Sequence, residues 1–138
     1  MPINIMFVDS ADCVHEAVKW VLKDEPYYLI TFKCPLEALR AIEEEEFTVV
    51  IADQLLPEMS GIDFLKKVKE RWPNTMGIIM TAFVESKAAI NAMNCGYVCQ
   101  FVKKPLDRKR FKRAVEMAIS SYEIEVESQK LLRRRSRH

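Results

Sequence analysis

The chain has 138 residues, which suits a single domain, and 49% of them are hydrophobic while 30% are charged. A chain of this length and composition can bury a core of its own without disulfide or metal staples. The formal net charge is +1. The chain therefore lacks the overall excess of positive charge that is typical of proteins with a polyanionic partner.

The cysteine and hydrophobicity patterns indicate the thiol state and the cellular location of the protein. The four cysteines, at positions 13, 34, 95 and 99, form no CxxC pair, and the chain has only two histidines. A zinc site is therefore not expected, and we predict reduced and mostly buried thiols. No run approaches the roughly 18 apolar residues of a membrane span, and no signal-peptide pattern is visible, so we expect a cytoplasmic location.

In chain order, short apolar runs alternate with segments whose apolar residues recur at helical spacing. The runs are rich in β-branched side chains, which is typical of strands buried on both faces. Strands are predicted at residues 3–8, 27–32, 47–52, 76–80 and 97–102, and helices from Cys13 to Leu22, from Pro35 to Glu46, from Ser60 or Gly61 to just before Pro73, from Glu85 to Asn94, and from a cap at Asp107 onward.

The order of strand then helix recurs five times, which predicts a parallel sheet with helices on both faces, joined by right-handed crossovers. The fold class is therefore α/β, a doubly wound five-stranded parallel sheet of the flavodoxin-like kind with an extended C-terminal helix. For a strand order of 2-1-3-4-5, the ligand-binding crevice lies at the carboxyl edge, between strands one and three.

The stretch from residue 49 to residue 61 is central to the prediction. Four apolar residues from Val49 run directly into Asp53, and a loop containing Pro57 and Gly61 follows. Asp53 would then stand at the carboxyl end of a buried strand, where such sheets bind ligands. Taken alone, Asp53 is equally compatible with capping a turn or the next helix, because aspartate is common in turns.

Polar residues close the other apolar runs in the same way and would meet at one edge of the sheet. Asp9 and Asp53 would flank the crevice, where two carboxylates repel unless a cation or a proton joins them. An oxygen-only site suits Mg²⁺, and an aspartate carboxylate can act as a nucleophile toward phosphorus. Lys104 and Thr81 would then neutralise and hydrogen-bond the transferred phosphoryl oxygens.

These residues and their surrounding loops resemble a known family. From residue 3 to about residue 122, the sequence is similar to a response-regulator receiver domain of two-component signal transduction, the CheY-like family. The matching marks are Asp53 after the third strand, Leu56 to Gly61 against the family loop MPxMxG, Thr81-Ala82 as the hydroxyl and small residues, Phe101 at the aromatic switch position, and Lys104-Pro105.

The resemblance implies a signalling domain and not an enzyme, apart from self-catalysed phosphoryl transfer and autodephosphorylation. Asp53 would accept a phosphoryl group from a sensor histidine kinase or a phosphotransfer protein, with help from Thr81 and Lys104. Thr81 and Phe101 would then switch a protein–protein interface. The resemblance also implies a cis peptide bond before Pro105.

The implied metal site departs from the family pattern. The resemblance assigns Mg²⁺ to Asp9, Asp53 and the backbone of Leu55, but Ser10 stands where the family has a second acid. Asp12 is nearby, and we expect it to cap the first helix and not to bind metal. Mg²⁺ binding is therefore expected to be weak.

Two alternatives to a phosphorylated receiver stay open. Ser10 is the mark of a receiver-like interaction module that works without phosphorylation. A small α/β phosphate enzyme is the other alternative, and it is disfavoured because the chain has only three glycines and no glycine-rich phosphate loop.

The last helix is longer than a receiver needs. One apolar stripe, made of Phe111, Val115, Ala118 and Tyr122, predicts packing on the domain, and a second stripe of Met117, Ile124 and Leu131 follows it at a spacing of seven. We expect a receiver domain over residues 1–122 and a helical linker over residues 123–138. The linker would lead toward an output domain, and the extension or the face of the last helix would form a homodimer.

Basic residues gather between Lys103 and Arg113 and again between Arg133 and Arg137. Nucleic-acid binding is one interpretation of such runs. Because no DNA-binding fold follows and the net charge is near zero, we expect a solvated helix face with intersubunit ion pairs, and neither a nucleic acid nor a membrane as partner.

Overall fold

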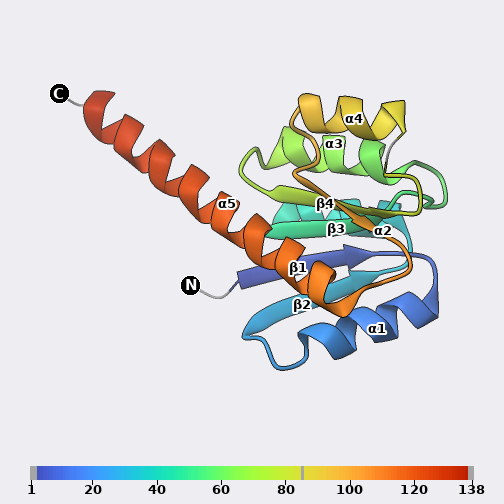
Figure 1. Cartoon of the computed structure of the whole chain (residues 1–138). Helices are drawn as coiled ribbons and strands as arrows, with labels where there is room; N and C mark the ends of the chain where they lie inside the picture. The colour runs from blue at the N-terminus through green and yellow to red at the C-terminus, as the bar shows by residue number, and fades with distance from the viewer. Residues whose placement is uncertain (1–2, 85, 137–138) are drawn as a thin grey trace.

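The computed structural model describes residues 3–84 and 86–136, in which strands and helices alternate along the chain (Figure 1). The strands are β1 (Ile3–Val8), β2 (Tyr27–Phe32), β3 (Val49–Asp53), β4 (Met76–Thr81) and β5 (Gln100–Lys103). The helices are α1 (Asp12–Leu22), α2 (Pro35–Glu44), α3 (Gly61–Arg71), α4 (Lys87–Asn94) and α5 (Arg108–Ser136).

The strands form one parallel sheet in the order β2-β1-β3-β4-β5, which confirms the predicted fold class and topology. The order reverses between β1 and β3, whose registers align Phe7 with Ile51 and Val8 with Ala52. The carboxyl ends of these two strands therefore lie side by side, and the crevice expected for ligands opens between them.

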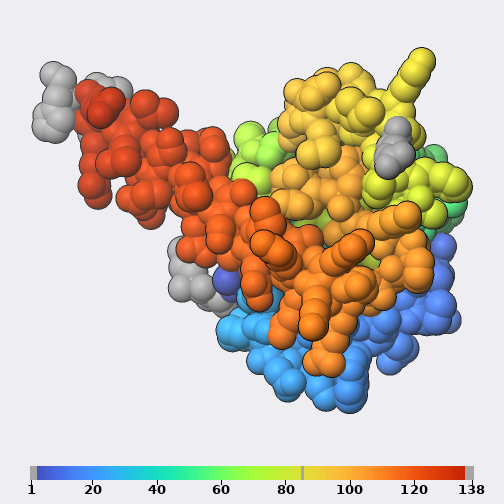
Figure 2. Space-filling view, viewed as in Figure 1, coloured from blue at the N-terminus to red at the C-terminus, as the bar shows by residue number. Residues whose placement is uncertain are grey.

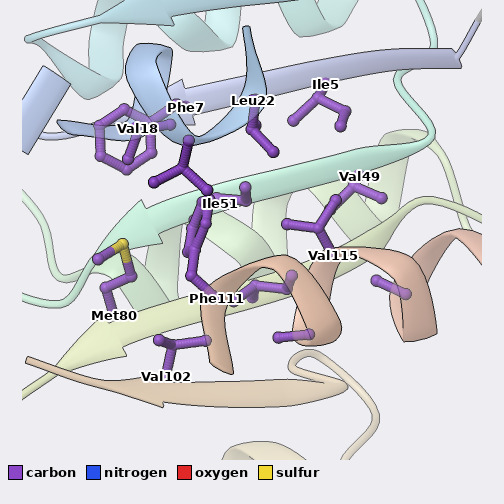
Figure 3. Close-up of a cluster of buried hydrophobic side chains, with 14 of the residues drawn as sticks. Ile5, Phe7, Val18, Leu22, Val49, Ile51, Met80, Val102, Phe111 and Val115 are labelled. Atoms are coloured by element: carbon purple, nitrogen blue, oxygen red, sulfur yellow. The ribbon is translucent and has the colours of Figure 1, made fainter. Parts of the chain in front are cut away.

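Two hydrophobic cores sandwich the sheet because successive side chains of each strand point to opposite faces. Ile5 and Phe7 of β1 belong to the core under α1 and α5, while Met6 and Val8 belong to the core under α2, α3 and α4. Figure 3 shows the first core, where Phe111 and Val115 of α5 meet side chains from β1, β3, β4 and β5. Every central strand is thus covered on both faces, as its apolar composition requires.

Helix α5 packs on the domain with its first half and extends beyond it with its second. Of the predicted stripe, Phe111, Val115 and Ala118 are buried and Tyr122 is half-buried. The last turns of the helix stand clear of the body as an arm (Figures 1 and 2). The helix passes residue 122 without a break, and residues 137 and 138 lie outside the described residues, so the division at residue 122 stays a prediction.

Side-chain hydrogen bonds fasten the base of this arm to the domain. The hydroxyl of Tyr122 donates to Glu46 Oε1 over 2.9 Å. Further along, the amides of Asn74 and Gln129 exchange two hydrogen bonds of 3.1 and 2.9 Å. Because these partners lie on loops of the domain, they hold the direction of α5 well past the end of its buried stripe.

Several predicted boundaries shift in the structure. The fifth strand begins at Gln100 and not at Tyr97, because the Tyr97 N–H donates to Ala92 O and closes α4 after Gly96, which has a φ of +81°. The fourth helix begins at Lys87 with Ser86 as its N-cap, and the predicted start at Glu85 lies outside the described residues.

Two expectations about polar residues are wrong, and one is confirmed. Asp107 caps α5, since its Oδ1 accepts from the Arg110 N–H at 3.0 Å. Asp12 does not cap α1; it lies inside the first turn and pairs with Lys33. The cysteines are free thiols, but none is buried, because Cys13 and Cys95 are exposed and the other two are half-buried.

Within the part of the chain that the structure describes, no helix is long and apolar enough to cross a membrane.

Candidate functional site

Four of the five strands deliver a polar residue to the carboxyl edge of the sheet. Asp9 follows β1 directly, Asp53 ends β3, Thr81 ends β4, and Lys104 follows β5. Asp9, Asp53 and Thr81 are buried, and Lys104 is half-buried. Because Asp53 pairs in register with Met80, Thr81 lies one position beyond it on the neighbouring strand.

Lys104 joins the two aspartates across the crevice. Its Nζ lies 3.1 Å from Asp9 Oδ2 and 3.1 Å from Asp53 Oδ1, so the two carboxylate oxygens lie within twice that distance of each other. Burial works against the charged ammonium, but the hydrogen bonds and charges of Asp53 and Asp9 outweigh it and raise the pKa of Lys104. The ammonium therefore stays charged and balances part of the negative charge of the pair.

The segment after β1 fixes Asp9 in place. Asp9 Oδ1 accepts a hydrogen bond of 2.8 Å from the Ala11 N–H, and the Asp9 N–H donates to Phe32 O on the neighbouring strand. The ring of His15 lies against the Asp9 carbonyl oxygen. Sequence reasoning missed His15, although its place three residues before Val18 and seven before Leu22, on the buried face of α1, was a usable signal.

The loop after Asp53 is closed by Gln54, a second residue that sequence reasoning missed. The Gln54 N–H donates to Met80 O at 3.1 Å, its carbonyl accepts from the Gly61 N–H at 3.0 Å, and its side-chain oxygen accepts from the Ile62 N–H at 3.0 Å. The Leu55 side chain projects into solvent, with 75% of its surface exposed. Gln54 thus ties the loop beside the acid to β4 and to the start of α3.

A pocket of about 300 Å³ opens next to the acidic pair. Thr81, Phe83 and the half-buried Phe101 line it together with Leu55 and residues of the β3–α3 loop and α4. The Thr81 hydroxyl oxygen accepts a hydrogen bond of 3.1 Å from the Phe83 N–H. Thr81 therefore connects the acidic edge to the loop that forms one wall of this pocket.

The residues near the missing acid do not replace it. Ser10 is exposed at the end of β1. Its neighbour Asp12 is hydrogen-bonded to Lys33, which together with the lysine charge lowers the pKa of Asp12. The charged Asp12 carboxylate is thus paired with Lys33, which follows β2. The Lys104–Pro105 peptide bond that follows the site is cis.

Comparison with known proteins agrees with this geometry. The response regulator receiver domain family matches residues 5–116, which is most of the chain. The chain belongs to the response regulator receiver domain family. It is therefore a receiver domain of two-component systems, in which an acidic pocket of this kind generally binds Mg²⁺.

The receiver domain is similar to the receivers of transcriptional regulators. It is 34% identical over 118 residues to the transcriptional regulatory protein ZraR of Salmonella typhimurium, covering 86% of this chain and 26% of that protein. It is 27% identical over 126 residues to the hydrogenase transcriptional regulatory protein HoxA of Bradyrhizobium diazoefficiens, covering 91% of this chain and 26% of that protein. The chain thus spans about a quarter of the length of these curated relatives.

A solved receiver dimer has the same fold. The beryllofluoride-activated NtrC4 receiver domain dimer superposes with a TM-score of 0.79 at 27% identity, covering 86% of this chain and 98% of that chain. The flavodoxin-like, CheY-like architecture expected from the sequence is thus shared with experimentally determined receivers.

The oxygen atoms at the crevice suit the cation that receivers generally bind. Mg²⁺ is commonly held by one or two carboxylates while several waters complete its shell, and Asp9 and Asp53 supply two. Among residues 3–84 and 86–136, no group of three His, Cys, Asp or Glu side chains gathers around one point. The donor set therefore fits Mg²⁺, with fewer protein charges than three carboxylates would provide.

Proposed function

We propose that this receiver domain accepts a phosphoryl group on Asp53 from a sensor histidine kinase or a phosphotransfer protein, and that the new charge changes a protein–protein interface. The observation that carries the proposal is the Lys104 ammonium, 3.1 Å from Asp53 and 3.1 Å from Asp9 at the carboxyl edge of the sheet. A carboxylate with a fixed cation beside it is suited to receive phosphoryl oxygens.

The transfer itself needs little more than positioning. A carboxylate oxygen of Asp53 forms an O–P bond while the P–N bond of a phosphohistidine breaks, and the electron pair leaves with the imidazole. Lys104 and the backbone near Leu55 hold the phosphoryl oxygens during this exchange. Since Lys104 already contacts Asp53, its charge is in place before the donor arrives.

A divalent cation fits the same site. Asp9, Asp53 and the backbone of Leu55 would hold Mg²⁺, which offsets the negative charge of the phosphoryl oxygens when it is bound. Ser10 contributes no charge, so we expect this binding to be weak. Asp9 is the residue that keeps a carboxylate at the metal position, because it is buried and hydrogen-bonded at both of its oxygens.

The switch would pass from the acidic edge to the pocket beside it. A phosphoryl group on Asp53 attracts the Thr81 hydroxyl, whose oxygen now accepts from the Phe83 N–H. Moving Thr81 frees that loop, and Phe101 reorients within the adjoining pocket of about 300 Å³. The result is a population shift on the face of α4, β5 and α5, not a new fold.

Helix α5 supports a dimeric receiver that transmits a signal to an output domain. Met117, Ile124 and Leu131 lie on its exposed side, with 49%, 69% and 51% of their surfaces accessible. Tyr122 and Gln129 hold the helix to the domain on its other side. An arm fixed in direction and apolar along one edge is suited to pairing with a second copy.

Ser10 favours a second candidate function, a receiver-like interaction module that works without phosphorylation. The loss of a metal-binding acid lowers the charge available for a divalent cation at the crevice. In that case the face of α4, β5 and α5 would bind its partner in one fixed state.

Intact-mass measurement after incubation with acetyl phosphate and Mg²⁺ separates the two functions. The proposal expects one phosphoryl group on the wild type and none on Asp53→Asn, with the same cooperative unfolding for both proteins. Wild-type protein that stays unmodified at saturating donor and Mg²⁺ would favour the interaction module. A phosphoryl group on any other residue would remove Asp53 as the acceptor.

A further inference from the structure

His15 places a buried imidazole directly against the backbone of the acidic site. Only 5% of its surface is exposed, and its Nε2 is hydrogen-bonded to the Asp9 carbonyl oxygen. Because a carbonyl oxygen only accepts, the ring donates through an Nε2–H. The ring of Phe7 meets the imidazole edge-on, with centroids 5.1 Å apart and planes at 70°, and this packing fixes the ring orientation.

This contact completes the hold on Asp9. The Asp9 N–H is bonded to Phe32 on β2, Oδ1 accepts from Ala11, and Oδ2 accepts from Lys104. The carbonyl held by His15 belongs to the peptide that leads to Ser10. A rotation about the Asp9 Cα–C bond moves this carbonyl and carries Ser10 and Ala11 with it, which would take the Ala11 N–H away from Oδ1. The imidazole therefore helps to determine where the carboxylate lies.

We propose that His15 is a positioning residue for the acidic site. By holding the Asp9–Ser10 peptide, it fixes the Asp9 carboxylate in the orientation that receives a divalent cation next to Asp53. Exact placement of Asp9 matters more in this chain because Ser10 supplies no second carboxylate. The inference rests on the proposed function for its consequence, but the hold on Asp9 is a property of the metal-free domain.

Two substitutions and one control test the role. His15→Leu keeps a buried apolar side chain and removes the donor, while His15→Gln restores an N–H donor at about the same reach. Val18→Ala is the matched control, because Val18 is fully buried on the same helix as His15 and belongs to the same hydrophobic core as Phe7. For each protein we would measure the Mg²⁺ dissociation constant by calorimetry, the rate of phosphorylation by acetyl phosphate, the exchange of the Ala11 amide without metal, and unfolding in urea.

We expect His15→Leu to weaken Mg²⁺ binding about threefold to tenfold, the range for one lost hydrogen bond, and to speed exchange of the Ala11 amide. His15→Gln should restore most of the wild-type Mg²⁺ affinity and most of the slow exchange of the Ala11 amide. Val18→Ala should be less stable but keep the wild-type Mg²⁺ affinity and Ala11 exchange.

The proposal is overturned if His15→Leu keeps the wild-type Ala11 exchange, or if Val18→Ala changes that exchange and Mg²⁺ binding as much as His15→Leu does. Amide exchange needs neither metal nor phosphodonor, so it decides the role of His15 even if the wild type is never phosphorylated. A wild type that is not phosphorylated while His15→Leu still speeds Ala11 exchange would refute the proposed function and leave the positioning role standing.

Discussion

Gly61 lies directly against the backbone of Asp53. A β-carbon built at position 61 would collide with the Asp53 carbonyl oxygen and would lie 2.9 Å from Cδ1 of Ile79. The Gly61 N–H also donates to Gln54 O. The first residue of α3 is therefore in close contact with the end of β3 and hydrogen-bonded to the residue that follows it. The absence of a side chain at position 61 is what allows the acidic site and the helix to approach this closely.

We predict that Gly61→Ala displaces Asp53 and lowers both stability and phosphorylation. The displaced atoms are backbone and a fully buried side chain, so we expect a loss of about 1–3 kcal/mol in the free energy of unfolding. Urea denaturation and the rate of phosphorylation by acetyl phosphate measure the two effects. Gly96→Ala is the control. The φ of +81° at Gly96 makes this substitution strained as well, but no atom lies within 4 Å of the new β-carbon. Position 96 follows α4, at the opposite end of β5 from Lys104 and the acidic site. Equal phosphorylation rates for the two variants would contradict the prediction.

We predict that Ser10→Asp tightens Mg²⁺ binding about tenfold to a hundredfold. A contact to a charged group contributes roughly 1.5–3 kcal/mol, and each 1.4 kcal/mol is a factor of ten in affinity. The added carboxylate should also lower metal-free stability slightly, because it repels Asp9 and Asp53. Calorimetric titration of both proteins measures the affinities. If the affinities are equal, another group already fills the position of the missing acid, and Ser10 does not weaken Mg²⁺ binding.

We predict that the apolar edge of α5 forms a homodimer. Replacing Ile124 and Leu131 together by serine should weaken the dimer, because these exposed side chains have no cover in one domain. Light scattering at high micromolar concentration gives the mass of each protein. Lys130→Ser, an exposed substitution on the same helix, should leave the mass unchanged. A wild-type monomer at that concentration would rule out assembly through this helix.

We predict that the contribution of Tyr122 to stability is lost as pH rises above 10. Burial, followed by the hydrogen bond to Glu46, raises the pKa of Tyr122 from 10.0 to about 12. The folded state therefore holds the phenol proton more tightly than the unfolded state. Its contribution is fully present below pH 10 and is lost as pH rises toward 12.

Urea denaturation at several pH values from 9, below this window, to about 11.5, within it, tests the assignment. Tyr122→Phe should be less stable than the wild type below pH 10 and should lose less stability between pH 10 and the top of the series. Tyr28→Phe serves as the control, because Tyr28 is exposed on β2. Parallel pH curves for wild type and Tyr122→Phe would show that this hydroxyl is not linked to folding.

The order of elements and the edge that carries the acidic site were both predictable from sequence. Short β-branched runs and helical spacing are local patterns, so β1 and β2 begin and end at the predicted residues. Parallel strands direct their carboxyl ends to one edge, which is why Asp9, Asp53 and Lys104 could be expected together before any coordinates. The likeness to receivers rested on the same residues.

Tertiary structure alone decided three other side-chain contacts. The pairing of Asp12 with Lys33, the contact of His15 with the Asp9 carbonyl, and the bond from Tyr122 to Glu46 all join separate elements or loops of the chain. The helix-capping role expected of Asp12 was wrong because α1 begins at Asp12 itself, with Ala11 as its N-cap, and the Asp12 carboxylate pairs with Lys33. Local spacing states which face a residue occupies, but its partner depends on the distance and angle between packed elements, and those are determined only when the whole sheet and both helical layers are assembled.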